Sequence, residues 1–235
     1  MGNVILAINT STTQFSVGLV DDQGALLAEW TLSSRVKGFR DFMPALDHLL
    51  QASGVPVTQI RALAVAKGPG SFTGLRVGLS AAKGFCEGLR VPIVALSSLE
   101  VLASQCPGLS IPICPVMDSR KGEVFAALYA WSAEQELVVL EPEACLKIKD
   151  LRGFIRKRAY VLGTDYNRQS EGIASAAGDR AVLAPPCFWN LRAATLGMMA
   201  ARKAGSQQFD SLRELVPSYL RPPDIRPNPY SISKG

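Results

Sequence analysis

Short apolar runs alternate with turns and amphipathic stretches along the chain. Val4–Ile8 is a continuous apolar run, which is typical of a strand buried on both faces. Two further segments, Phe15–Leu19 and Ala25–Trp30, follow across polar turns and carry strand patterns of their own. We therefore expect the chain to open with three strands in a meander.

Helical spacing replaces this pattern after the meander. Between Phe42 and Leu50, apolar residues recur every three or four positions, and Gly54 stands where a helix C-cap is expected. Ala62–Ala66 then predicts a buried strand, followed by a glycine-rich turn and a second helix over Thr73–Leu89. Val91–Leu96 predicts another strand, and the serines that follow it are typical of a helix start.

A second unit of strands and helices begins near Cys106. Its expected strands are Ile111–Met117, Glu123–Ala130, Leu137–Leu140, Ala159–Leu162 and Val182–Leu183, and its expected helices are Ile148–Lys157 and Asn190–Ala204. We predict an α/β protein with two lobes. Residues 1–105, completed by a helical segment at about 190–220, form the first lobe, and residues 106–189 form a smaller second lobe. Residues 221–235 are rich in proline and polar residues, which predicts an extended or disordered tail.

Element order in the first unit is more specific than its composition. A meander followed by helix, strand, helix and strand is the order of the RNase-H-like unit used by actin-type proteins.

Apolar residues make up 48% of the chain and charged residues 19%, which excludes a disordered protein. The apolar runs are too short for a membrane span and no signal-peptide pattern opens the chain, so we expect a cytoplasmic protein.

The cysteines and the net charge give weaker indications. The five cysteines form no CxxC pair and no zinc-type spacing, which predicts free thiols in a reducing compartment. A net charge of +5 would tolerate a polyanion such as RNA without specifying one. Arg152, Arg156, Lys157 and Arg158 form a small basic patch, which is either a solvated helix face or a contact for RNA.

The glycine-rich turn lies where backbone amides can bind a phosphate. Gly68, Gly70 and Gly74 stand between a buried strand and a helix. However, Thr73 occupies a position where both a Rossmann and a Walker fingerprint require glycine. Anion binding and a plain tight turn therefore both remain open.

Small residues continue down the helix that follows the turn. Each interior glycine, such as Gly78 or Gly84, costs about 1 kcal/mol relative to alanine. Rows of small residues at helical spacing allow another backbone to approach closely. We expect the helix to pack against a neighbour, either within the chain or in another subunit.

The same residues carry a resemblance to a known family. Residues 67–84, KGPGSFTGLRVGLSAAKG, resemble the signature of the TsaB (YeaZ) family. Weaker matches follow in order through most of the chain, at ILAINTST (5–12), PIVALSSLE (92–100), MDSRKGEVFAALY (117–129) and LVPSYLR (215–221).

This resemblance implies a two-lobed actin/Hsp70-like (ASKHA) fold and a supporting role. The family acts beside the catalytic subunit TsaD and the ATPase TsaE, which together place a threonylcarbamoyl group on adenosine 37 of tRNAs reading codons that begin with A. The chain would then meet tRNA through the complex and have no catalytic residue of its own. Its first two helices would pair with those of TsaD or of a second copy. The expected interface residues on the second helix are Gly74, Gly78, Ala81, Ala82 and Phe85.

The resemblance also implies a degenerate nucleotide cleft, with no firm cofactor, no metal and at most weak binding of ATP or ADP. The residues we expect in this nucleotide or anion site are Thr10, Ser11, Gly68, Gly70, Ser71 and Asp118. Relatives usually carry aspartate where this chain has Asn9, and that carboxylate helps hold the metal in ATP-using members of the superfamily.

Two classes of enzyme are the alternatives to this role, a small-molecule kinase and a metalloprotease. A small-molecule kinase of the same superfamily would need carboxylates near the turns, and Asp118 and Asp165 are the candidates. A metalloprotease would need clustered ligands, but His48 is the only histidine and no HExxH motif occurs, so we exclude it. We expect a non-catalytic partner subunit.

Overall fold

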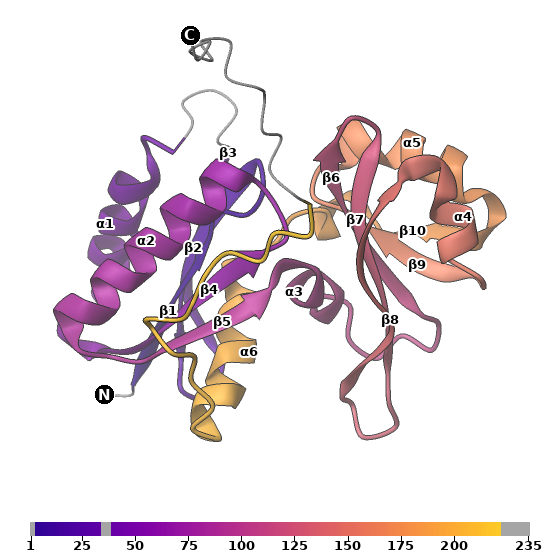
Figure 1. Cartoon of the computed structure of the whole chain (residues 1–235). Coiled ribbons are helices and arrows are strands. Elements are labelled where there is room, and N and C mark those ends of the chain that lie inside the picture. Colours follow the sequence, from indigo (N-terminus) through magenta and orange to yellow (C-terminus); the bar gives the residue numbers. More distant parts are fainter. Residues whose placement is uncertain (1–2, 34–38, 222–235) are drawn as a thin grey trace, which may run out of the picture.

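The structure is a computed structural model that describes residues 3–33 and 39–221 of the 235-residue chain. Two lobes lie side by side, each built on its own five-stranded sheet (Figure 1). The predicted tail falls almost wholly on residues 222–235, which lie outside the described residues. Within the described part, no helix combines the length and the apolar character needed to cross a membrane.

The first sheet has the strand order β3-β2-β1-β4-β5. Its strands are β1 (Val4–Asn9), β2 (Gln14–Asp21), β3 (Leu26–Ser33), β4 (Ile60–Gly68) and β5 (Ile93–Ser97). β1, β2 and β3 pair antiparallel, whereas β4 and β5 run parallel to β1. Every residue of β1 is buried, as its continuous apolar run predicted for a strand at the centre of a covered sheet.

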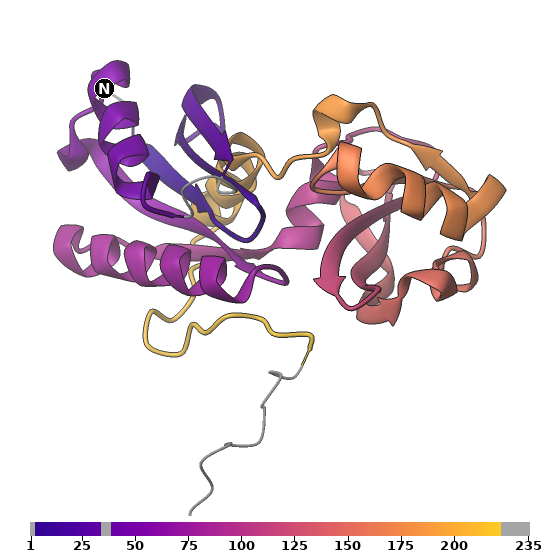
Figure 2. The same ribbon diagram turned by 90° about the horizontal axis from the view of Figure 1, so that it is seen from above.

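Helices cover both faces of the first sheet. α1 (Phe42–Ser53) packs on β2 and β3, and α2 (Phe72–Leu89) packs mainly on β4, so the two share one face. α6 (Ala193–Gly205) returns from the second lobe to pack against β1 and β2 on the other face. Figure 2 shows the first sheet between α6 and the α1–α2 pair. α3 (Ser98–Ser104) leads towards the second lobe.

The second sheet has the strand order β8-β7-β6-β9-β10. Written in this direction, the order matches that of the first sheet, with β8 in the place of β3. Its strands are β6 (Ile113–Arg120), β7 (Glu123–Trp131), β8 (Leu137–Lys147), β9 (Ala159–Leu162) and β10 (Ala181–Leu183). The short α4 (Leu151–Phe154) and the longer α5 (Tyr166–Ala177) accompany it. Four single 3-10 turns complete the described elements: Val57–Gln59, Ile148–Asp150, Gly178–Arg180 and Pro186–Phe188.

The two sheets repeat one arrangement. In each, three antiparallel strands are followed by two strands parallel to the first. This duplication of an RNase-H-like unit confirms the predicted α/β, two-lobed actin/Hsp70-like fold. Gly54, in a left-handed conformation, and Ser97, whose hydroxyl accepts two amide hydrogen bonds, cap α1 and α3 as predicted.

Several predicted boundaries in the second lobe were wrong. The helix expected over 148–157 is only a 3-10 turn and one turn of α-helix, ending at Phe154, because Ile155 has a non-helical conformation (ψ 81°) and begins the loop that leads to β9. β8 extends to Lys147 rather than Leu140, paired with β7 along its length. α5 was not predicted at all, since only Ile173 and Ala177 of its residues are buried and its apolar pattern is faint.

Candidate functional site

The β1–β2 turn packs directly against the glycine-rich turn. Thr10 and Ser11 are each 1% exposed, and the Ser71 amide donates to the Ser11 carbonyl oxygen at 2.8 Å. Gly70 has a φ of 156°, and a Cβ there would lie 2.3 Å from the same oxygen. Glycine is required at this position by both conformation and space.

Two glycines of α2 allow the helix to approach Thr10. A Cβ at Gly74 would lie 2.0 Å from the Thr10 carbonyl oxygen, and one at Gly78 would lie 2.1 Å from Thr10 Oγ1. The Thr10 hydroxyl donates to the Gly74 carbonyl at 2.7 Å, and the Ser71 hydroxyl caps α2 by accepting from the Gly74 amide at 3.2 Å. On this side of α2, the small residues therefore serve a contact within the chain.

The residues predicted for an anion site are thus only partly assembled. Thr10, Ser11, Gly70 and Ser71 lie together, but the Ser71 and Gly74 amides are already bonded inside the chain. Gly68 adjoins the C-terminal part of the chain: a Cβ there would lie 2.6 Å from the Ser218 carbonyl oxygen. Asp118 belongs to the second lobe, where Arg168 pairs with it at 3.1 Å.

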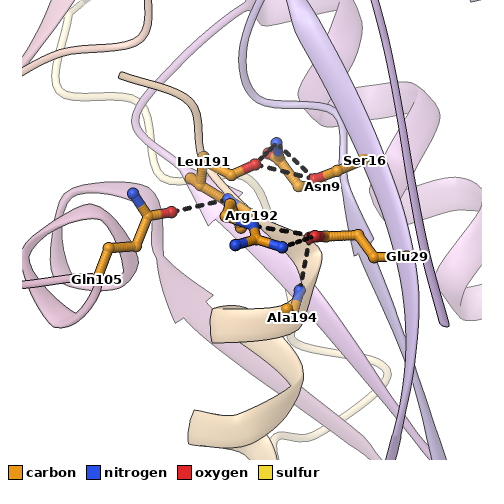
Figure 3. A network of polar contacts seen from close by, with 7 residues as sticks. All are labelled: Asn9, Ser16, Glu29, Gln105, Leu191, Arg192 and Ala194. Carbon is orange, nitrogen blue, oxygen red and sulfur yellow. Dashed lines mark hydrogen bonds and ion pairs between the residues drawn. The ribbon is translucent and has the colours of Figure 1, made fainter. Parts of the chain in front are cut away.

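Asn9 occupies the end of β1, the position at which the family resemblance implies an aspartate. It is fully buried, and its Oδ1 accepts from the backbone amide (3.0 Å) and the hydroxyl (2.7 Å) of Ser11. Its Nδ2 donates to the Leu191 carbonyl oxygen at 3.2 Å and to Ser16 Oγ at 3.4 Å (Figure 3). A carboxylate could not donate these bonds, so the amide acts here as a structural group.

A second polar network holds the start of α6 at the lobe junction. The Glu29 carboxylate of β3 accepts from Arg192 Nε and from the Ala194 amide, both at 2.9 Å (Figure 3). Gln105, just after α3, accepts from the Arg192 amide at 2.9 Å and donates to the Phe188 carbonyl at 3.2 Å. The two chain connections between the lobes are therefore bonded to each other, and the second is also bonded to the first sheet.

The outer face of α2 presents a different set of small residues. Ser80, Gly84 and Gly88 are exposed, and a Cβ at either glycine would meet no atom within 4 Å. Of the predicted interface residues, Ala81 and Phe85 are half-buried beside this face. The other three, Gly74, Gly78 and Ala82, are buried within the chain. The described exposed apolar side chains near α1 and α2 include Met43 (53% exposed) and Phe72 (41% exposed).

A C-terminal strap, residues 207–221, runs along the first lobe to the second (Figure 1). Its Asp210 carboxylate accepts from the Ala95 amide at 2.8 Å, and its Ser218 amide donates to the Lys67 carbonyl at 2.7 Å. Tyr219 stacks on Phe72 with ring centroids 5.1 Å apart. Arg221 then crosses to the second lobe, which was not foreseen from sequence.

The end of the strap bonds to the β6–β7 turn. Arg221 Nη1 donates to the Ser119 carbonyl at 2.9 Å and lies 3.5 Å from a Glu123 carboxylate oxygen. The strap thus links the glycine-turn lobe to the lobe that carries Asp118. The helical segment predicted over about 190–220 is wrong beyond Gly205, where α6 ends, because residues 207–221 form this non-helical strap. The strap includes the LVPSYLR match (215–221).

Glu143 makes another contact between the lobes. Its carboxylate accepts a hydrogen bond from the hydroxyl of Ser97, at the end of β5. Burial is the largest influence on the Glu143 carboxyl and raises its pKa. The hydrogen bond from Ser97 lowers the pKa, and the nearby charge of Glu100 raises it. Lys67 and the hydrogen bond with Tyr129 lower it by smaller amounts. Burial, followed by Glu143 and Glu100, also raises the pKa of the Tyr129 hydroxyl.

Two hollows lie near these contacts. One, of about 350 Å³, is lined by Gln14 of β2 together with Asp165 and Asn190, so it lies where the lobes meet. The other, of about 220 Å³, lies in the second lobe and includes the ion-paired Asp118 and Arg168. Both are open to solvent, and neither is lined by the glycine-rich turn.

The remaining chemical candidates are accounted for by their surroundings. His48 packs edge-on against Trp30, with ring centroids 4.4 Å apart. All five cysteines are free thiols, and burial raises the pKa of Cys86 and of Cys106 to about 11. Among residues 3–33 and 39–221, no group of three or more His, Cys, Asp or Glu side chains is placed to hold a metal.

Comparison with known proteins gives one consistent result. The family model described as "TsaD: tRNA N6-adenosine threonylcarbamoyltransferase" matches residues 39–180. The tRNA threonylcarbamoyladenosine biosynthesis protein TsaB of Bacillus subtilis is 29% identical over 225 residues, covering 92% of this chain and 93% of that protein. TsaB of Escherichia coli is 36% identical over 147 residues, covering 59% and 63% of the two chains.

The solved structures agree on the fold. YeaZ from Pseudomonas aeruginosa superposes with a TM-score of 0.74 at 22% identity, covering 93% of this chain and all of that chain. The similarity thus extends over more than nine-tenths of the chain. The chain belongs to the TsaB (YeaZ) family, within the TsaD-type group of proteins.

Proposed function

We propose that this chain is the non-catalytic partner subunit that a TsaD-type enzyme needs to form threonylcarbamoyladenosine at position 37 of tRNAs reading ANN codons. The observation that carries the proposal is the similarity to the B. subtilis tRNA threonylcarbamoyladenosine biosynthesis protein TsaB, which spans nine-tenths of both chains. We expect it to act in the cytoplasm, with a TsaE-type ATPase as the third component.

The geometry of the glycine-rich turn favours a non-catalytic partner subunit over an enzyme. Asn9 places a neutral, internally bonded amide where a metal-holding carboxylate would stand. The β1–β2 turn and Thr10 fill the space around Gly70, Gly74 and Gly78. These contacts stabilise the first lobe and leave little room for a phosphate at this position.

The kinase alternative is not favoured by the comparisons, which identify a tRNA-modification family. The site gives it little support as well. Asp118, the best candidate for its base, forms an ion pair with Arg168 in the second lobe. The Asp118 carboxylate also accepts from the Arg120 amide at 3.1 Å, so both of these partners lie in the second lobe, away from the glycine-rich turn.

For the partner surface, we propose α1 together with the outer face of α2. Ala81 and Phe85 border this face, and the exposed Gly84 and Gly88 carry no side chain at two of its positions. A surface of this kind lets a second helix pack closely. The same face would serve pairing with a TsaD-type subunit or with a second copy of the chain.

Co-purification with the TsaD-type protein of the same organism tests this surface. Gly84→Glu places a charged side chain on the open face without an internal clash, so we expect a folded monomer that no longer retains the partner. Gly205→Glu is a matched control, because Gly205 is also an open helical glycine but lies at the end of α6, which covers the other face of the sheet. Equal retention of the partner by both variants would rule out this face of α2.

A further inference from the structure

The loop between α4 and β9 holds three consecutive cations away from the protein. Ile155 and Ala159 are both fully buried and fix the two ends of the loop. Arg156, Lys157 and Arg158 lie between them, and all three are exposed. The fold therefore presents these side chains to solvent as a group, rather than scattering them along a helix.

Two more arginines join the loop cations. Arg180 Nη1 donates to the carbonyl oxygens of Arg152, at 2.7 Å, and of Ile155, at 3.1 Å, so its guanidinium lies against the end of α4. The Arg152 side chain is itself half-exposed. We call the five side chains Arg152, Arg156, Lys157, Arg158 and Arg180 the basic edge.

Acidic side chains balance this edge only in part. Asp179 pairs with Arg152 at 2.6 Å, and Glu141 pairs with Arg156 at 3.2 Å. Within the described part of the chain, neither Lys157 nor Arg158 belongs to an ion pair. Two of the five cations are thus paired with carboxylates, and the two at the centre of the loop, Lys157 and Arg158, are not paired with any described residue.

The basic edge lies far from the proposed partner surface. α4 is at the outer end of the second lobe, whereas α1 and α2 are at the outer end of the first (Figures 1 and 2). A subunit docked on α1 and α2 would therefore leave the edge open to solvent. The aromatic residues beside the loop, Phe154 and Tyr160, are half-buried, so the exposed groups of the loop are cations.

We propose that the basic edge binds the phosphate backbone of the tRNA while α1 and α2 hold the enzyme subunit. This inference rests on the proposed function, which makes a tRNA the macromolecule that the complex must hold. Lysine and arginine contacts to phosphates supply salt-sensitive affinity without reading bases. The edge would therefore contribute equally to tRNAs of different sequence and would leave selection of adenosine 37 to the enzyme subunit.

Binding of an unmodified tRNA transcript by the complex of this chain with its TsaD-type partner tests the proposal. The dissociation constant is measured at salt concentrations between about 50 and about 200 mM. For the Lys157→Ala/Arg158→Ala double variant, we expect weaker binding and a slope of log Kd against log salt reduced by about two, one for each lost phosphate contact. The control, Arg202→Ala/Arg213→Ala, removes two exposed charges from the first-lobe side and should keep the wild-type slope.

Several results would overturn the proposal. These are an unchanged slope for the double variant, an equal loss in the control, or a loss confined to tRNAs reading one codon class. Preferential binding of the edge to phosphatidylserine vesicles over tRNA would also count against it. Retention of the TsaD-type partner is measured in parallel. If the double variant keeps both its partner and the wild-type salt dependence, only tRNA binding by the basic edge is refuted. If the wild-type chain itself fails to retain the partner, the proposed function is refuted.

Discussion

Asn9 Nδ2 donates a hydrogen bond to the carbonyl oxygen of Leu191, 3.2 Å away and 182 residues later in the chain. The bond joins the end of β1 to the connection by which the chain returns from the second lobe. Because Oδ1 accepts from Ser11 at the same time, this site uses both ends of the amide. The Asn9 amide thus forms part of the lobe junction.

Replacing Asn9 by aspartate should therefore destabilise the protein in a pH-dependent way. A buried carboxylate facing the Leu191 carbonyl would have no donor to offer, and we expect a loss of about 2–4 kcal/mol near neutral pH. Burial would raise the pKa of the new carboxyl above its unfolded value, so the loss should shrink as pH falls and the group binds its proton. Thermal unfolding as a function of pH measures this, with the exposed Asn3→Asp as control. A loss that does not vary with pH would contradict this explanation.

The two kinds of glycine in α2 should respond oppositely to alanine. A Cβ at Gly78 would lie 2.1 Å from Thr10 Oγ1, so Gly78→Ala forces apart the β1–β2 turn and α2 and should cost about 2–3 kcal/mol. Gly84 faces open space, so Gly84→Ala should stabilise the helix by up to about 1 kcal/mol. Chemical denaturation of both variants provides the comparison, and the same sign for both would be inconsistent with the structure.

Glu143 should make stability fall as pH rises. Its carboxyl holds its proton more tightly in the folded state, because burial raises its pKa above the ordinary 4.5. Ionisation therefore costs folding free energy, and this cost grows as pH rises from the ordinary value through the raised one.

The Glu143→Gln variant keeps an acceptor for the Ser97 hydroxyl and removes the ionisation. We expect it to have a higher Tm than wild type at about pH 8 and a difference that disappears at about pH 4. Glu136→Gln, at an exposed position of the same hairpin, should leave the pH profile unchanged. A wild-type Tm advantage at high pH would show that the Glu143 carboxylate is stabilising instead.

Arg221 should restrain the second lobe. Arg221→Ala removes the hydrogen bond to the Ser119 carbonyl and the ion pair with Glu123. We expect amide hydrogen exchange in the β6–β7 turn to become about fivefold faster, equivalent to about 1 kcal/mol. Arg213→Ala removes an exposed cation from the same strap and should leave this exchange unchanged. If the two variants exchange alike, the strap end does not hold the turn.

The strands and the order of the first lobe could be predicted because buried strands carry continuous apolar runs. α5 could not, since its sequence contains few large apolar residues and only one side of it contacts the sheet. The glycines of α2 show a different limit. Gly74 and Gly78 share a helical spacing with Gly84 and Gly88, yet the first pair contacts Thr10 and the second faces open space. Periodicity identifies a row of small residues but not its neighbour.

Part of the arrangement around the glycine-rich turn was also predictable, whereas anion binding there stays a prediction. Thr10, Ser11, Gly70 and Ser71 were expected to lie together and do, because a strand end and a strand-to-helix turn meet at one edge of the sheet. The roles of Glu29, Glu143 and Arg221 depend on contacts between segments far apart in the sequence. No local pattern marks such pairs.

As the proposed partner subunit, the chain should enable tRNA modification without catalysing it. The most direct measurement is the threonylcarbamoyladenosine content of an ANN-reading tRNA after reaction with purified TsaD-type and TsaE-type proteins, threonylcarbamoyl-adenylate and ATP, with and without this chain. We predict modification only when the chain is present, a strong loss with Gly84→Glu, and none with the chain alone. Full modification in the absence of the chain would contradict the account.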